Sequence, residues 1–171
     1  MTTSTTTTTP RPSTRAVLRT AAVTVPIILG IGFLMGQVSN SGYGNAWFDA
    51  LAKPALMPPG WVFGAAWSAL YILLGISLAM VWAAAPSRAR SSGLTLFFAQ
   101  LALNFAWSPM FFAWHQVGAA LALIAAMLLL AVAAAMHVYR VRRVAAWLLL
   151  PYLAWLAFAS YLNFEILRLN A

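Results

Sequence analysis

Long apolar runs, separated by short polar or proline-containing segments, set the pattern of this chain. Five of the runs approach or exceed the roughly 20 residues that a helix needs to cross a bilayer. They span about 21–38, 61–85, 93–114, 117–139 and 145–169. The pattern therefore predicts an all-α, polytopic membrane protein, in which residues 17–171 form one bundle of five transmembrane helices.

The segment before the first run has a different composition. Residues 1–16 are rich in Thr, with Ser and Pro, and lack apolar periodicity, which predicts a disordered tail. Arg11, Arg15 and Arg19 before an apolar run resemble a signal peptide. The run is long, however, and has no convincing small-x-small cleavage site, so we expect a retained first helix. Its Gly32 and Gly36 are spaced for close helix packing, which we expect to be internal rather than a dimer contact.

Prolines and glycines predict where the helices bend or end. Residues 39–60 form a long loop, and Trp47, Phe48 and Leu51 within it are spaced as one face of a short interfacial helix. The second run should begin just after two prolines and stop at Pro86, with a short loop over 87–92. Pro109 should kink the third run.

Composition agrees with a membrane location. Hydrophobic residues make up 63% of the chain and charged residues only 7%, whereas soluble domains carry about 25% charged residues. Without cysteine there are no disulfides or thiolate metal sites. The net charge of +8 could suggest nucleic acid, but the arginines lie at the ends of apolar runs, where they orient helices in a membrane. We expect a lipid membrane and no nucleic acid as partner.

The basic residues also predict an orientation. With the N-terminus in the cytoplasm, eight basic residues lie inside: Arg11, Arg15, Arg19, Arg88, Arg90, Arg140, Arg142 and Arg143. Only Lys53 and Arg168 lie outside. The positive-inside rule therefore places the N-terminus in the cytoplasm, and the loop at 39–60 and the C-terminus outside. A bacterial inner membrane is favoured, with an outer membrane left open.

Polar side chains within the runs are few. Gln100, Asn104 and Ser108 recur every fourth residue and so share one helix face. We expect Asn104 and Asn163 to hydrogen-bond between helices rather than to do chemistry. Glu165 should pair with Arg168 or Lys53.

Few groups are suited to catalysis. Asp49 should cap the loop or pair with Lys53. His115 and His137 lie near opposite ends of their helix and cannot share a metal, although either could be a lone axial ligand for a haem iron. No nucleophile–base pair, phosphate loop or metal-ligand spacing is present, so neither a hydrolase nor a transferase is predicted and no cofactor is required.

The aromatic residues are the remaining candidate site. Trp61, Phe63 and Trp67 open the second run, while aromatic residues also occur in the third run and at Trp155 in the fifth. If these faces converge beneath the loop, they form a cavity for a flat, largely apolar ligand whose carboxylates could reach Lys53. Ordinary helix packing is the alternative.

Three motifs in order resemble the tryptophan-rich sensory protein / translocator protein family, once called peripheral benzodiazepine receptors. The first runs Trp47-Phe48-x-x-Leu51-x-Lys53-Pro54-x-x-x-Pro58-Pro59-x-Trp61-x-Phe63-x-x-x-Trp67-x-x-Leu70-Tyr71. The second is Leu103-Asn104-x-x-Trp107-Ser108-Pro109-x-Phe111-Phe112. The third is Pro151-Tyr152-x-x-Trp155-x-x-Phe158-Ala159-x-x-Leu162-Asn163. The likeness covers nearly the whole chain except the tail and the fourth run.

The resemblance implies a bundle that is commonly a homodimer, with a ligand cavity closed by the first loop. It implies binding of porphyrins such as protoporphyrin IX and haem, and a role in tetrapyrrole transport, sensing or regulation. The implied ligand-binding residues are Trp47, Lys53, Pro54, Trp61, Phe63, Trp67, Asn104, Trp107, Ser108, Phe111, Trp155, Ala159 and Asn163.

An alternative implied by the resemblance is a photo-oxidase that degrades protoporphyrin IX in light, with Trp67 and Trp155 as catalytic residues. Whether the chain is an enzyme stays open on the sequence. A third alternative is a sterol-binding translocator, whose mammalian motif has the form Leu-Asn-Tyr-x-x-x-Arg. Here Phe164 replaces the tyrosine and Glu165 adds a charge, so sterol binding is expected to be weak.

Overall fold

The computed structural model describes residues 13–171. In that part of the chain, five helical segments are long and apolar enough to cross a membrane. They are Thr14–Val38, Gly60–Trp82, Arg88–Ala113, Val117–Val141 and Arg143–Leu169. The predicted fold class, an all-α membrane protein with five spanning helices, is confirmed. Most of the predicted tail at 1–16 lies outside the described residues.

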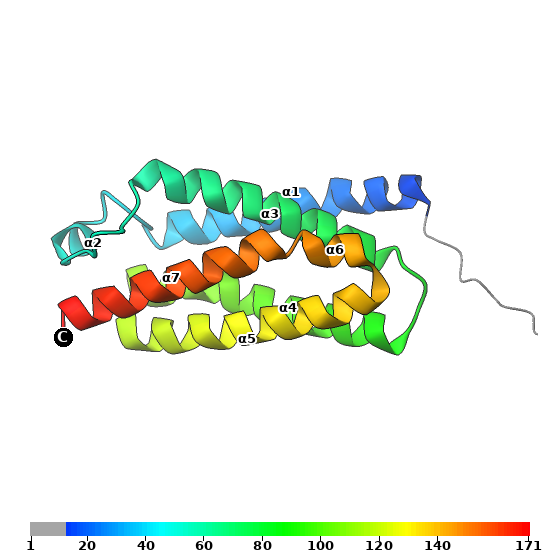
Figure 1. The fold of residues 1–171 in the computed structure, drawn as a ribbon. Helices are drawn as coiled ribbons and strands as arrows, with labels where there is room; N and C mark the ends of the chain where they lie inside the picture. Colours follow the sequence, from blue (N-terminus) through cyan, green and yellow to red (C-terminus); the bar gives the residue numbers. More distant parts are fainter. Residues whose placement is uncertain (1–12) are drawn as a thin grey trace, which may run out of the picture.

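The helices run side by side as a bundle (Figure 1). The elements are α1 (Thr14–Val38), α2 (Ala46–Ala50), α3 (Gly60–Trp82), α4 (Arg88–Ser108), η1 (Pro109–Ala113), α5 (Val117–Val141), α6 (Arg143–Trp147) and α7 (Leu150–Leu169). Helix α1 packs on α3 and α4, α4 packs on α5, and α7 lies between α5 and α3. The α2 segment and the C-terminus lie at one end, and the start of α1 and the α3–α4 connection lie at the other (Figure 1).

Two helices begin earlier than predicted because a serine caps each of them. Ser13 Oγ accepts a hydrogen bond from Ala16 N at 3.2 Å, so α1 begins at Thr14 rather than near 21, and residues 14–16 are helical. Ser87 Oγ accepts from Arg90 N at 3.1 Å, so α4 begins at Arg88 and the loop expected over 87–92 is mostly helix. Both serines satisfy backbone N–H groups that a helix start leaves unpaired. Helix α3 ends at Trp82, before Pro86.

Pro109 changes the helix type rather than simply bending it. Proline has no N–H and its ring crowds the carbonyl four residues earlier, and the chain responds with a π-helical turn, η1. Trp114 N donates to Pro109 O at 3.0 Å, a five-residue step. This wider turn leaves the adjacent side chains of Phe111 and Phe112 both buried, and π turns of this kind are frequent at functional sites.

The fifth span is interrupted, which the sequence analysis did not predict. A short helix, α6, ends at Trp147, and α7 begins at Leu150 with Pro151 in its first turn. Because proline lacks an N–H, it fits a helix start and cannot continue the helix before it. Ser77 Oγ donates to Ala145 O at 2.9 Å, which anchors α6 to α3.

Glycines allow α1 and α3 to approach closely. A Cβ on Gly75 would lie 2.7 Å from Val25 Cα, and Thr24 Oγ1 donates to Gly75 O at 2.8 Å. A Cβ on Gly32 would clash with the Tyr71 ring, so Gly32 packs internally as expected, whereas Gly36 has nothing within 4 Å.

Candidate functional site

A compact cover lies over one end of the bundle, built from residues 40–57 around α2. Asn45 caps α2, with its Oδ1 accepting from Phe48 N at 3.2 Å and its Nδ2 donating to Asn40 O at 2.9 Å. Asp49 Oδ2 accepts from Gly44 N at 2.9 Å. Gly44 has φ of +93°, a conformation that glycine adopts readily. The predicted short helix is present, and Asp49 caps the loop as expected.

Lys53 fastens the cover internally. Its ammonium group donates to the carbonyl oxygens of Phe48 at 2.7 Å, Asp49 at 3.0 Å and Leu51 at 3.1 Å. It also lies 4.7 Å from the centre of the Phe48 ring. An ammonium group has three N–H donors, and all three are used here. In this structure Lys53 is therefore engaged with backbone carbonyls and is not free for a ligand carboxylate.

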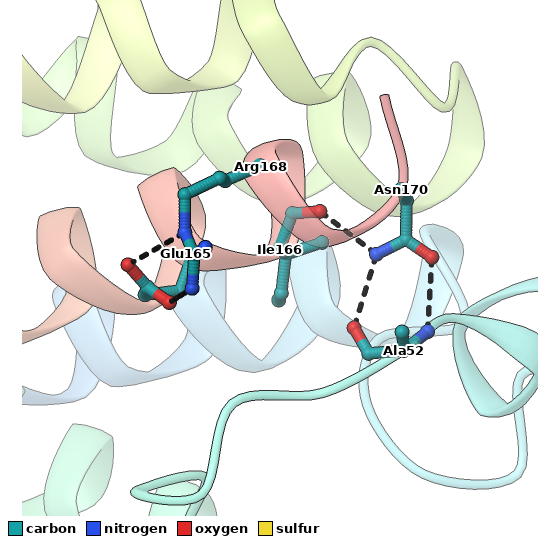
Figure 2. A network of polar contacts seen from close by, with 5 residues as sticks. All are labelled: Ala52, Glu165, Ile166, Arg168 and Asn170. Carbon is teal, nitrogen blue, oxygen red and sulfur yellow. Dashed lines mark hydrogen bonds and ion pairs between the residues drawn. The ribbon is translucent and has the colours of Figure 1, made fainter.

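Asn170 joins the cover to the end of α7 (Figure 2). Its side-chain amide accepts from Ala52 N at 2.9 Å and donates to Ala52 O at 3.0 Å. The same amide donates to Ile166 O at 2.8 Å, which fixes it to the helix. The Asn170 amide thus bonds both the N–H and the carbonyl of Ala52, as the backbone of a neighbouring β-strand would, and it connects positions 118 residues apart. Nothing in the sequence indicated it.

Directly beneath α2 the aromatic rings pack against one another. Phe48 and Phe112 have ring centres 5.2 Å apart in an edge-to-face arrangement. Trp107 stacks on Phe111 at 5.0 Å, and Trp47 meets Phe111 at 5.6 Å. We call these five rings the upper aromatic group. Several of the residues expected to line a cavity directly below the loop therefore contact one another there, in edge-to-face and stacked arrangements.

A second set of rings, the lower aromatic group, lies between α3 and α7. Trp67 and Trp155 have ring centres 6.4 Å apart at 83°. Phe63 meets Trp155 at 5.9 Å, and Trp67 also contacts Tyr71 and Tyr152. Phe63, Trp67 and Trp155 are only half-buried. The two tryptophans named as catalytic candidates are thus brought together from separate helices.

A chain of hydrogen bonds fixes the two tyrosines of this group, Tyr71 and Tyr152, to helix α4. Tyr71 Oη donates to Asn104 Oδ1 at 2.8 Å, and Asn104 Nδ2 donates to Tyr152 Oη at 3.1 Å. Tyr152 Oη donates onward to Gln100 Oε1 at 2.6 Å. Asn104 therefore bonds between helices, as predicted, and Gln100 and Tyr152, which were not assigned to the site, complete the chain.

Asn163 makes the second predicted interhelical bond. Its Oδ1 accepts from Trp107 Nε1 at 3.3 Å, and its Nδ2 donates to Val117 O at 3.0 Å. Ser108, by contrast, forms a hydrogen bond with the hydroxyl of Ser41 in the loop. Ser108 therefore belongs to the attachment of the cover, although it shares a face with Gln100 and Asn104.

Trp155 carries an unused donor. Its indole Nε1 is buried and has no hydrogen-bond partner among the described residues. Buried polar atoms are nearly always paired, so an unpaired N–H at this position is unusual. Trp155 also borders a hollow of about 390 Å³ between α3 and α7, next to Phe158 and Leu70. That volume lies within the range of about 300–1,000 Å³ for small-molecule sites.

Of the remaining predicted residues, Pro54 and Ala159 are buried or half-buried, whereas Trp61 lies on the surface. Pro54 is a buried residue of the cover, and Ala159 packs on the bundle core near Trp155. Trp61 is 74% exposed and contributes to neither aromatic group, so the structure does not bring this predicted cavity residue together with the others. At about 100° per residue, Trp61 and Trp67 point about 120° apart on one helix, whereas Phe63 and Trp67 share a face.

At the end of α7 the predicted ion pair is present. Arg168 Nη2 lies 2.7 Å from Glu165 Oε2 (Figure 2). Phe164, at the position of the sterol motif's tyrosine, is half exposed. The arginine of that motif is therefore paired within the chain, and the hydroxyl is absent.

Comparison with known proteins agrees with this architecture. The model of the TspO/MBR family matches residues 22–169. The chain is 40% identical over 147 residues to "Tryptophan-rich protein TspO" of Archaeoglobus fulgidus, covering 84% of this chain and 92% of that protein. It is 40% identical over 144 residues to "Translocator protein" of Homo sapiens, covering 82% and 84%.

A third relative is "Tryptophan-rich sensory protein" of Cereibacter sphaeroides, 38% identical over 126 residues, covering 74% of this chain and 78% of that protein. The family match spans all five membrane helices and both aromatic groups. The chain therefore belongs to the TspO/MBR family, as a multi-pass membrane protein.

Proposed function

We propose that this protein binds a porphyrin such as protoporphyrin IX or haem at the lower aromatic group, and acts in tetrapyrrole transport, sensing or regulation. The observation that carries the proposal is the indole pair of Trp67 and Trp155, which are half-buried and in contact from two helices, with Trp155 bordering a hollow. Flat aromatic guests stack on such rings. The unpaired Trp155 N–H supplies a hydrogen bond that orients the guest.

In this proposal the cover controls access to the site. Lys53 holds the cover together by hydrogen bonds within it, and Asn170 attaches the cover to the end of α7. Because these bonds join the Lys53 and Asn170 side chains to backbone groups and do not reach the indole pair, their part in binding is to keep the cover in place. The site we propose therefore lies deeper than the sequence predicted, between α3 and α7 rather than directly under α2.

Protoporphyrin titration tests the proposal. In purified protein, protoporphyrin IX should quench tryptophan fluorescence with a saturable, one-per-chain isotherm. Trp67→Leu/Trp155→Leu should weaken binding by about tenfold or more, since losing two ring contacts and a hydrogen bond removes about 1.5–3 kcal/mol. The matched control is Trp61→Leu/Trp147→Leu, which removes two exposed tryptophans. Equal affinity in the two double variants, measured by the porphyrin's own absorbance shift, contradicts the proposal.

Light-dependent degradation of bound protoporphyrin is a second candidate. The close approach of Trp67 and Trp155 favours it, because a tryptophan pair beside an excited ring can exchange electrons with it while dissolved oxygen serves as oxidant. Illuminated in air, wild type should lose the Soret band faster than Trp155→Phe at equal porphyrin occupancy. If wild type and Trp155→Phe bleach at equal rates, or if wild type bleaches no faster than free porphyrin, the degradation hypothesis is rejected and only the binding function is supported.

The orientation is part of the proposal. Arginines lie at the end of the bundle away from α2, at the start of α1, the start of α4 and the α5–α6 junction. By the positive-inside rule we place that end in the cytoplasm of a bacterial inner membrane, with the cover outside. A reporter that is active only in the cytoplasm should be inactive when fused at the C-terminus, and an active fusion would reverse the assignment.

A further inference from the structure

A groove of about 700 Å³ runs along the outside of the bundle between α1, α3 and α4. It is separate from both aromatic groups. Its walls are almost entirely apolar and include Ile27, Ile31, Leu101 and Phe105. Thr24 lies in the wall, but its hydroxyl donates to Gly75 O within the protein. The groove thus offers a surface for a hydrocarbon chain.

One charged residue lines this groove. Arg19 lies at the end nearest the start of α1, close to Trp82 at the end of α3. Arg19 is exposed. At about 1.5 Å per residue, Arg19 and Ile31 are about 18 Å apart along the helix. That length is close to one leaflet of a hydrocarbon core about 30 Å thick, so the groove matches one acyl chain with a headgroup at Arg19.

A second cation is fixed beside the same end. The Arg90 guanidinium donates to Val81 O at 3.2 Å and to Trp82 O at 2.7 Å. It lies 5.9 Å from the centre of the Trp82 ring. The rim of the groove therefore has one guanidinium held in place on α3 and one, Arg19, exposed on α1.

The protein has no carboxylate to balance these charges. The whole sequence contains only two acidic residues, Asp49 and Glu165. Asp49 lies in the cover and Glu165 near the C-terminus, both at the opposite end of the bundle. Guanidinium groups bind phosphate oxygens well because their paired N–H groups match the phosphate geometry. The positive charge of Arg19 and Arg90 at this rim would therefore be balanced by an anion that is not part of the chain.

We propose that this groove binds an anionic phospholipid from the leaflet at the arginine-rich end, with its phosphate on Arg19 and one acyl chain along α1 and α4. A second copy of the chain fits less well. In a symmetric pair about an axis along the membrane normal, this face would bring Arg19 and Arg90 of both copies to one membrane depth, where like charges repel. A neutral lipid fits the walls but supplies no net negative charge to balance the two guanidinium groups.

Native mass spectrometry of the full chain, purified from vesicles containing equal phosphatidylglycerol and phosphatidylcholine with identical acyl chains, tests the proposal. Wild type should retain one phosphatidylglycerol per chain in preference to phosphatidylcholine. Arg19→Gln should lower that retention about fivefold, the effect of one arginine at an anionic surface. Arg140→Gln, which removes another exposed arginine at the same end outside the groove, should leave retention unchanged.

A second variant keeps the test independent of charge. Ala102 lines the groove and is exposed, so Ala102→Phe fills the groove without entering the core. It should also lower phosphatidylglycerol retention, with the monomer–dimer distribution unchanged. Equal losses for Arg19→Gln and Arg140→Gln would mean diffuse surface charge and overturn the site. A shift toward monomer in Ala102→Phe with lipid retention intact would overturn it in favour of a second copy.

Discussion

Few polar atoms in the core of this bundle lack a hydrogen-bond partner among the described residues. Within the membrane few side chains can hydrogen-bond, and nearly all of those in the described core do so internally, as Tyr71, Asn104 and Tyr152 show. The buried indole N–H of Trp155 is an exception. At the scale of one residue, an unpaired donor beside a hollow distinguishes a binding site from ordinary packing.

Trp155→Phe should weaken porphyrin binding by about two- to tenfold, because it keeps most of the ring area but removes a hydrogen bond worth about 0.5–1.5 kcal/mol. Fluorescence titration with protoporphyrin IX measures the effect. Trp147→Phe, at an exposed tryptophan on α6, is the control and should match wild type. An unchanged affinity in Trp155→Phe would show that the N–H does not contact the ligand.

Lys53→Met should speed release of a dicarboxylate porphyrin and of its neutral dimethyl ester by similar factors. The sequence analysis left open a direct pair between Lys53 and a ligand carboxylate. In the structure the ammonium is bonded to three carbonyls of the cover, so its loss loosens the cover for any ligand. Stopped-flow release rates measure this. A loss confined to the dicarboxylate would restore the direct-pairing hypothesis.

At the scale of elements, breaks in the helices position the side chains. The π turn at Pro109 turns Phe111 and Phe112 toward α2 together. The contact between Asn170 and Ala52 attaches the cover to α7 (Figure 2). These features let a short polar loop cover a bundle that is otherwise apolar.

Asn170→Ala should raise the proteolytic cleavage rate of the loop over 51–57 severalfold while leaving the thermal midpoint within about 2 °C. The change removes the two hydrogen bonds that attach the cover and the one that holds the Asn170 amide to Ile166 O, and it removes no core packing. Asn40→Gly is the contrasting variant, because Asn40 uses its backbone N–H and carbonyl but not its side chain, and glycine keeps its left-handed backbone at φ of +48°. If both variants are cleaved as slowly as wild type, Asn170 does not hold the cover closed.

Gly75→Ala should destabilise the bundle. A Cβ there would approach Val25 Cα to 2.7 Å, and overpacking of this kind costs about 1–3 kcal/mol, more than the roughly 1 kcal/mol that alanine gains over glycine in a helix. The thermal unfolding midpoint in detergent should fall. Gly36→Ala, with nothing within 4 Å, should leave the midpoint unchanged or raise it, and equal midpoints would mean that α1 and α3 do not cross closely at Gly75.

At the scale of the whole molecule, the sequence was sufficient for the fold and for part of the site. Five spans followed from the length of the apolar runs, because a bilayer fixes the length of a helix that crosses it. The helix starts at Thr14 and Arg88 were missed because serine caps extend each helix beyond its apolar run. The sequence predicted that Asn104 and Asn163 would each hydrogen-bond to a neighbouring helix, because amide side chains within a membrane must find partners.

The depth of the site was not predictable in the same way. Helix α3 is apolar around its whole circumference, so the membrane pattern alone does not say which tryptophans face inward. The spacing of Trp61 and Trp67 shows that they lie on different faces of the helix, but it does not show which of the two faces inward. The contact between Ala52 and Asn170 depends on the complete topology, because it joins two segments 118 residues apart.

Ligand protection of a single cysteine at position 159 tests the central claim most directly. The chain has no cysteine of its own, so Ala159→Cys, next to the indole pair, and Ala157→Cys, on the exposed side of α7, each carry one reporter thiol. If the porphyrin lies between α3 and α7, protoporphyrin IX should slow alkylation at 159 about tenfold and leave 157 unaffected. Equal alkylation rates at 159 with and without saturating protoporphyrin IX would contradict the account.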